Sequence, residues 1–133
     1  MSGDHRTTGV ILFAHGSSVE EANQGVHDLA RQVEEGGPYP FVRAAFLESA
    51  HPDLAEAVAL AAAAHLRRLI VIPYFLTLGI HLRRDLPNLI APLKRKYPQI
   101  RIEAGKSLEG HPQMPAIILG RAEEALRASE VNP

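Results

Sequence analysis

Short apolar runs alternate with helical apolar stripes four times along this chain. Each run is short and rich in β-branched or aromatic residues, which favours a buried strand. The four runs are Gly9 to Ala14, Phe41 to Leu47, Arg68 to Phe75 and Ile100 to Ala104. After each run, apolar residues recur every three or four positions, as on one face of a helix. The pattern therefore predicts four successive β-α units.

Capping and turn residues indicate where the predicted helices begin and end. Ser18 with Glu21 predicts a capping box at the start of the first helix. Asp85 is the expected N-cap of the third helix, and the fourth should run from about Gln113 to Arg127. Pro73 cannot donate to a sheet ladder, so we expect it near the end of its strand.

Strands joined by helices through short connections predict an α/β fold, with a four-stranded parallel sheet and helices on both faces. The 133 residues suit one domain, which we place at residues 9–128. The polar ends, residues 1–8 and 129–133, are expected to be frayed.

The composition limits which partners and which metal ligands this protein can have. The formal net charge is −1, so no long-range field attracts nucleic acid or an anionic membrane. The chain has no cysteine, which removes disulfides and thiolate metal ligands and fits a reducing compartment. No apolar stretch approaches the length of a membrane-spanning helix. We therefore expect a cytoplasmic protein whose metal ligands are imidazoles and carboxylates.

Three residues of that kind follow three successive predicted strands: His15, Glu48 and His81. The carboxyl ends of parallel strands share one edge, which is where α/β sheets bind ligands. Two imidazoles and one carboxylate suit Fe²⁺, Co²⁺, Ni²⁺ or Zn²⁺ better than Mg²⁺ or Ca²⁺. The residues alone leave two interpretations open, a shared metal site or three separate solvated side chains.

The polar residues next to His15 and His81 also allow two interpretations, a structural role or contact with a substrate. Ser17 and Ser18 could cap the first helix or also contact a substrate. Arg83 and Arg84 could be solvated residues beside Asp85, or they could bind carboxylates of a substrate.

Four segments together resemble the small-form sirohydrochlorin chelatases of the class II chelatase group. They are VILFAHGSS at positions 10 to 18, AAFLESAHPDLAEAV at 44 to 58, VIPYFLTLGIHLRRDLP at 71 to 87 and LEGHPQM at 108 to 114. The resemblance implies a three-layer chelatase-like fold. It also implies insertion of Co²⁺ or Fe²⁺, with Ni²⁺ an alternative, into sirohydrochlorin or a related tetrapyrrole during cobalamin or sirohaem biosynthesis.

The resemblance also implies roles for individual residues. His15 and His81 would contact the metal, with His15 as the leading base for the pyrrole protons and Glu48 offsetting charge. Ser17, Ser18, Arg83 and Arg84 would contact the macrocycle, the arginines through its acetate and propionate groups. The metal is a substrate, no organic cofactor is expected, and a half-size chain of this kind is expected to form a homodimer.

Two other functions are compatible with parts of the sequence. A non-catalytic carrier of metal or tetrapyrrole would use the same residues without turnover. A receiver-like signalling domain has a similar size, but it needs an acidic cluster after the first strand, where this chain has His-Gly-Ser.

Overall fold

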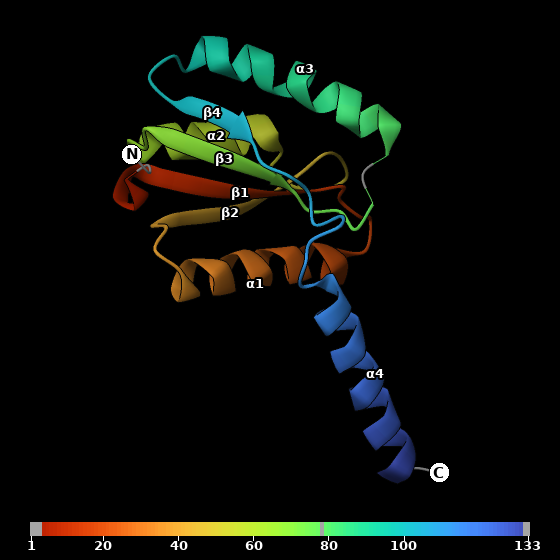
Figure 1. Ribbon diagram of the computed structural model, residues 1–133. Coiled ribbons are helices and arrows are strands. Elements are labelled where there is room, and N and C mark those ends of the chain that lie inside the picture. Colours follow the sequence, from red (N-terminus) through yellow and green to blue (C-terminus); the bar gives the residue numbers. More distant parts are fainter. Residues whose placement is uncertain (1–3, 78, 132–133) are drawn as a thin grey trace.

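The computed structural model describes residues 4–77 and 79–131, with the side chains of Ile80, His81 and Val131 outside the described part. Within it, four strands alternate with four α-helices after a turn of 3-10 helix at His5–Thr7 (Figure 1). The strands are β1 (Thr8–Ala14), β2 (Phe41–Phe46), β3 (Arg68–Pro73) and β4 (Arg101–Ala104). The helices are α1 (Glu20–Gly36), α2 (Leu54–Ala63), α3 (Ile80–Lys96) and α4 (Met114–Val131).

The strands form one parallel sheet in the order β2-β1-β3-β4, which confirms the predicted fold class. β1 lies between β2 and β3, with Val10 opposite Val42 and Ile70. Pro73 is the last residue of β3, as its missing N–H requires. The sheet order reverses between β1 and β3, so their carboxyl ends form the crevice in which such sheets bind ligands.

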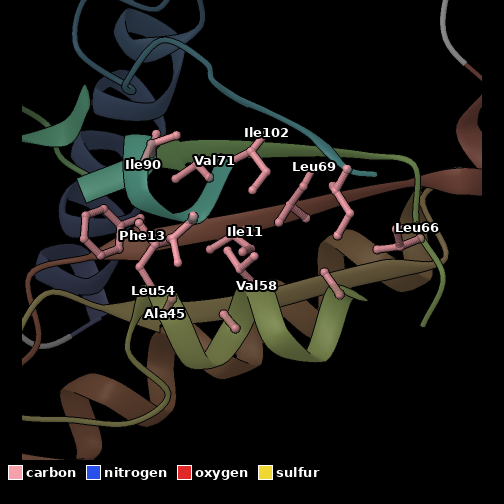
Figure 2. Close-up of a cluster of buried hydrophobic side chains, with 14 of the residues drawn as sticks. Ile11, Phe13, Ala45, Leu54, Val58, Leu66, Leu69, Val71, Ile90 and Ile102 are labelled. Carbon is pink, nitrogen blue, oxygen red and sulfur yellow. The ribbon is translucent and has the colours of Figure 1, made fainter. Parts of the chain in front are cut away.

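Both faces of the sheet carry helices (Figure 1). All seven residues of β1 are buried, which explains the uninterrupted run without polar side chains from Gly9 to Ala14. On one face, Ile11 and Phe13 pack with side chains of α2 and α3, including Val58 and Ile90 (Figure 2). On the other face, α1 packs against β1 and β2. Each large aliphatic side chain buried in these layers contributes about 1.5–3 kcal/mol.

The predicted start of α1 is wrong. The Ser18–Glu21 capping box does not form, because α1 begins at Glu20 after Val19, and no side chain caps it. Val19 has extended backbone angles, and the turn that precedes it is held by Ser17, whose hydroxyl accepts from the Val19 N–H (3.0 Å).

The predicted N-cap of α3 is also wrong. α3 begins at Ile80 after Gly79, so Asp85 lies inside it. The Arg83 N–H donates to the Gly79 carbonyl (3.1 Å), which closes the first turn well before Asp85. Four of the residues from Ile80 to Asp85 are polar, so this part of α3 shows no apolar periodicity in the sequence.

α2 begins at Leu54, with Asp53 as its N-cap. Asp53 and Glu56 form a capping box, since each carboxylate accepts from the other residue's N–H (2.8 and 3.0 Å). His51 Nδ1 lies 2.7 Å from Glu56 Oε1, and this hydrogen bond raises the pKa of His51. His51 therefore belongs to the helix entrance.

α4 departs from the layered body and extends away from the sheet (Figure 1). Its apolar side chains are largely exposed: Ile117, Ile118, Leu119 and Leu126. Among residues 4–77 and 79–131, no helix combines the length and apolarity needed to cross a membrane.

Candidate metal-binding and catalytic site

The loops that follow β1 and β2 are held together at the carboxyl edge of the sheet. The Leu47 N–H donates to the Ala14 carbonyl (2.9 Å), and the Glu48 N–H donates to the His15 carbonyl (3.0 Å). Both bonds continue the β1-β2 ladder beyond the strands. His15 and Glu48 are therefore placed side by side by backbone pairing, in a register that the sheet sets.

Gly16 makes this close approach possible. Its φ of +93° lies in a region that disfavours other residues. A Cβ built on Gly16 would lie 1.7 Å from the Glu48 carbonyl oxygen, a distance that two atoms cannot share. The glycine after His15 is thus a steric requirement of the site.

The side chains of His15 and Glu48 form a hydrogen-bonded pair. His15 Nε2 lies 2.9 Å from Glu48 Oε1, and the side chains are 60% and 62% exposed. A pair this exposed adds little to stability. A carboxylate bonded to one ring nitrogen does fix the orientation of the ring, and it leaves the other nitrogen for a metal or a proton.

Asn23 supports the turn that carries His15, although it lies in α1. Its Oδ1 accepts from the Ser17 N–H (2.9 Å), and its Nδ2 donates to the Ser17 carbonyl (2.8 Å). Asn23 is only 3% exposed, so these bonds satisfy a buried amide. Asn23 is a positioning residue that sequence analysis missed. A buried asparagine looks like any polar helix residue until its partner is known.

His81 lies in the first turn of α3, whereas the predicted N-cap at Asp85 had placed it before the helix. Its side chain lies outside the described residues, and the predicted shared ion between His15 and His81 stays a prediction. Its chain neighbours Gly79 and Leu82 both line the pocket that His15 borders. The backbone of His81 therefore lies beside that pocket.

This pocket lies at the β1/β3 switch point and has a volume of about 510 Å³. Its walls are mainly apolar, and its polar lining comes from three side chains, His15, Asp85 and Asn88. The apolar lining residues are Leu47, Phe75, Leu82 and Leu89. A large apolar pocket with a few convergent polar groups is the usual form of a small-molecule site.

A second pocket, of about 440 Å³, lies between α3 and the segment after β4. Arg83 lines it, and its Nη2 lies 3.3 Å from Oε2 of Glu109, which also lines it. Lys106 borders the same space. Sequence analysis did not select Glu109 and Lys106 as candidates, although both follow the fourth strand at the edge of the sheet where a ligand site was expected. Arg84 is exposed on α3.

The remaining candidates take part in local backbone bonds or lie at the surface. Ser17 bonds to Val19 as described, and Ser18 is exposed. His111 Nδ1 accepts from the Gln113 N–H (3.1 Å), so this ring takes part in the turn at the entrance to α4. Among the described side chains, no group of three or more histidines and carboxylates converges on one point. His15 and Glu48 bring one imidazole and one carboxylate together.

The parallel sheet has a histidine–carboxylate pair and an apolar pocket at its switch point. These features are typical of the α/β proteins whose ligand site lies at the carboxyl ends of the strands. Within that class, the chain belongs to the CbiX family, whose sequence model matches residues 9–125.

Relatives from distant organisms carry chelatase names. The sirohydrochlorin cobaltochelatase of Methanopyrus kandleri is 29% identical over 137 residues, which cover 88% of this chain and 96% of that protein. The chloroplastic sirohydrochlorin ferrochelatase of Arabidopsis thaliana is 28% identical over 118 residues, 89% of this chain and 52% of that protein. The chain thus matches nearly all of one relative and about half of the other.

Solved structures share the fold. A CbiX protein of cobalamin biosynthesis from Marinobacter aquaeolei VT8 superposes with a TM-score of 0.80 and 28% identity, over 91% of this chain and 98% of that one. The sirohydrochlorin chelatase SirB from Bacillus subtilis, in complex with cobalt, gives a TM-score of 0.70 and 26% identity, over 76% of this chain and 43% of that chain.

The support from Asn23 can be tested by substitution. Asn23→Ala removes two hydrogen bonds to Ser17 and should lower the free energy of unfolding by about 1–3 kcal/mol. It should also weaken Co²⁺ binding, because the turn carrying His15 loses its support. Isothermal titration well below the melting temperature measures this, with Gln24→Ala, an exposed neighbour on α1, as control. Unchanged Co²⁺ affinity in folded Asn23→Ala would contradict a positioning role.

Proposed function

We propose that this chain inserts a divalent metal ion, Co²⁺ or Fe²⁺, into sirohydrochlorin or a closely related tetrapyrrole. The observation that carries this proposal is the His15–Glu48 pair on the rim of the apolar pocket at the β1/β3 switch point. The names of the CbiX-family relatives support the same substrate and the same metals. The metal is a substrate here, and imidazole and carboxylate ligands suit both ions.

Metal insertion requires two pyrrole N–H protons to leave as the ion enters the ring. His15 is placed to accept a proton, since imidazole changes protonation state near neutral pH. Glu48, bonded to Nε2, orients the ring and offsets the positive charge of an incoming ion or of a protonated imidazole. His81, next to the same pocket along the chain, is the second proposed metal contact. Leu47, Phe75 and Leu82 give the flat macrocycle an apolar surface.

The acetate and propionate groups of the macrocycle need cations and hydrogen-bond donors. Arg83 and Arg84 are the proposed carboxylate partners, because guanidinium groups bind carboxylates through two parallel hydrogen bonds. Ser17 and Ser18, beside His15, are the proposed hydroxyl contacts. In the absence of substrate, Glu109 pairs with Arg83 and holds its guanidinium at the edge of the second pocket.

The proposal includes a homodimer. The chain matches 96% of the Methanopyrus protein but 52% of the Arabidopsis protein, so the longer relative has room for two units of this size. The exposed apolar side chains of α4 supply a surface that a second copy can cover.

An insertion assay tests the function directly. Absorbance spectra of sirohydrochlorin mixed with Co²⁺, Fe²⁺, Ni²⁺ or Zn²⁺ are followed with and without the protein. A chelatase accelerates the appearance of the metallated spectrum in a catalytic amount. A carrier binds metal or macrocycle but leaves the insertion rate at its background value, and that result would overturn the proposal.

Arg83→Ala should weaken substrate binding. Loss of one charged carboxylate contact should raise KM for sirohydrochlorin about tenfold and change kcat little, since the residue lies away from the reacting nitrogens. Arg31→Ala is the matched control, because Arg31 is similarly exposed and also pairs with a carboxylate, on α1. An unchanged KM in Arg83→Ala would mean that this guanidinium is only a solvated partner of Glu109.

A further inference from the structure

The insertion reaction releases two protons for each ion, so it needs two proton acceptors. In balance, two pyrrole N–H groups lose their protons, and the divalent ion takes their place on the ring nitrogens. His15 is the proposed acceptor of one proton, and its Nε2 already bonds to Glu48 (2.9 Å). His81 is proposed to hold the ion, and a ring nitrogen bound to an ion accepts no proton. The second proton therefore requires another group at the same pocket.

Asp85 places a carboxylate at this pocket. Among the described residues that line the pocket, it is the one with an acidic side chain. Leu82, Asp85 and Leu89 recur at the helical spacing of three and four, and all three line the pocket. The opposite side of α3 packs in the core through Leu86 and Ile90. The packing of α3 therefore turns the Asp85 carboxylate toward the pocket at the switch point.

The Asp85 carboxylate has no structural role in the described part of the chain. It caps no helix, because α3 begins at Ile80 and its first turn is closed at Gly79. Within residues 4–77 and 79–131, the carboxylate forms no hydrogen bond or ion pair. The residue is exposed, and the lining around it is mainly apolar. A polar group that points into an apolar pocket without a protein partner is typical of a residue that meets the ligand.

We propose that Asp85 is the second proton acceptor of metal insertion. His15 takes the proton of one pyrrole nitrogen, and the Asp85 carboxylate takes the proton of another and becomes a carboxylic acid. Both protons then pass to water. His15 lies on the loop after β1 and Asp85 on α3, so the two acceptors approach the ring from different elements. An ion that approaches the ring makes the N–H groups more acidic, which makes a carboxylate a sufficient base. This inference rests on the proposed function and adds a catalytic residue to it.

Asp85→Asn tests the acceptor directly, because it keeps the shape of the side chain and removes its basicity. We expect kcat for Co²⁺ insertion to fall about 10²-fold, as for the loss of a positioned base, with little change in KM for sirohydrochlorin. Binding of metal-free sirohydrochlorin, followed by its fluorescence, and Co²⁺ affinity should be unchanged. Glu35→Gln, which removes an exposed carboxylate of α1, is the matched control and should retain full activity. A normal kcat, a change confined to KM, or a loss of Co²⁺ affinity in Asp85→Asn would overturn the proposal.

Rescue by a small carboxylate separates proton transfer from a structural contribution of Asp85. Asp85→Ala leaves space beside an open pocket, and added formate should raise its kcat about tenfold in a saturable manner. Sodium chloride at the same ionic strength should have no such effect. Asp85→Glu retains a carboxylate and should keep more activity than Asp85→Asn. A loss of kcat in folded Asp85→Ala protein that formate does not reverse would overturn the role as proton acceptor.

The proposed function and the role of Asp85 fail in distinguishable ways. An unmodified protein that leaves the insertion rate at its background value would contradict the function and, with it, the role of Asp85. An unmodified protein that inserts Co²⁺ catalytically, together with an equally fast Asp85→Asn variant, would contradict the role of Asp85 alone.

Discussion

Replacing Gly16 with alanine is expected to destabilise the fold and to disable the metal site in one step. The φ of +93° is unfavourable for any residue with a Cβ, and the new atom would lie 1.7 Å from the Glu48 carbonyl oxygen. That oxygen belongs to backbone, so the loop after β1 or the loop after β2 must move. The conformational strain alone costs about 1–3 kcal/mol, and we expect the melting temperature to fall by roughly 5–15 °C.

The movement should also separate His15 from Glu48. Their side-chain contact of 2.9 Å depends on the backbone bond between the same two residues, which a Cβ at Gly16 would disrupt. Folded Gly16→Ala protein should therefore bind Co²⁺ more weakly, as isothermal titration below the melting temperature would measure.

Gly25→Ala is the control for the Gly16 substitution. Gly25 lies in α1 with no atom within 4 Å of a built Cβ. Alanine there should stabilise the protein by roughly 0.5–1 kcal/mol, because glycine is costly in a helix. Gly16→Ala protein with normal stability and normal Co²⁺ affinity would show that the loops after β1 and β2 are not locked together.

The alternation of apolar runs and helical stripes was sufficient to predict the parallel sheet. β1 is buried on both faces, and such a strand must be apolar throughout, so its sequence is distinctive. The same topology places the ends of β1 and β2 at one edge, which is why His15 and Glu48 could be nominated together from sequence. The sheet register that brings them within hydrogen-bond distance is a tertiary property.

The errors concern helix starts and partners distant in sequence. The capping signals at Ser18 and Asp85 were overridden by a turn held by Asn23 and by a first turn closed at Gly79. Capping residues favour a start but do not compete well with tertiary contacts. Glu109 was missed because its partner Arg83 lies on another element, 26 residues away.

α4 illustrates a different limit. Its helical periodicity was readable, and the helix is present. What its apolar side packs against could not be predicted from the sequence, because the spacing of an apolar stripe is the same whichever surface covers it. The position of α4 away from the sheet (Figure 1) is a tertiary property.

His15→Ala should remove most of the insertion activity while leaving the fold intact. The side chain is 60% exposed, so its loss creates no cavity, and the melting temperature should change little. A positioned acid or base contributes about 10²–10⁴-fold to a rate, and we expect kcat for Co²⁺ insertion to fall within that range. Glu48→Gln should cost less, about tenfold, because an amide can still hold the imidazole but carries no charge. His81→Ala should resemble His15→Ala if both imidazoles contact the ion.

A matched control variant decides between a chemical and a structural role of His15. His5→Ala removes an exposed histidine from the segment before β1, at the opposite edge of the sheet, and its insertion rate should equal that of the unmodified protein. A normal rate in His15→Ala at saturating metal would exclude His15 from the reaction and, with it, the role proposed for its pair with Glu48.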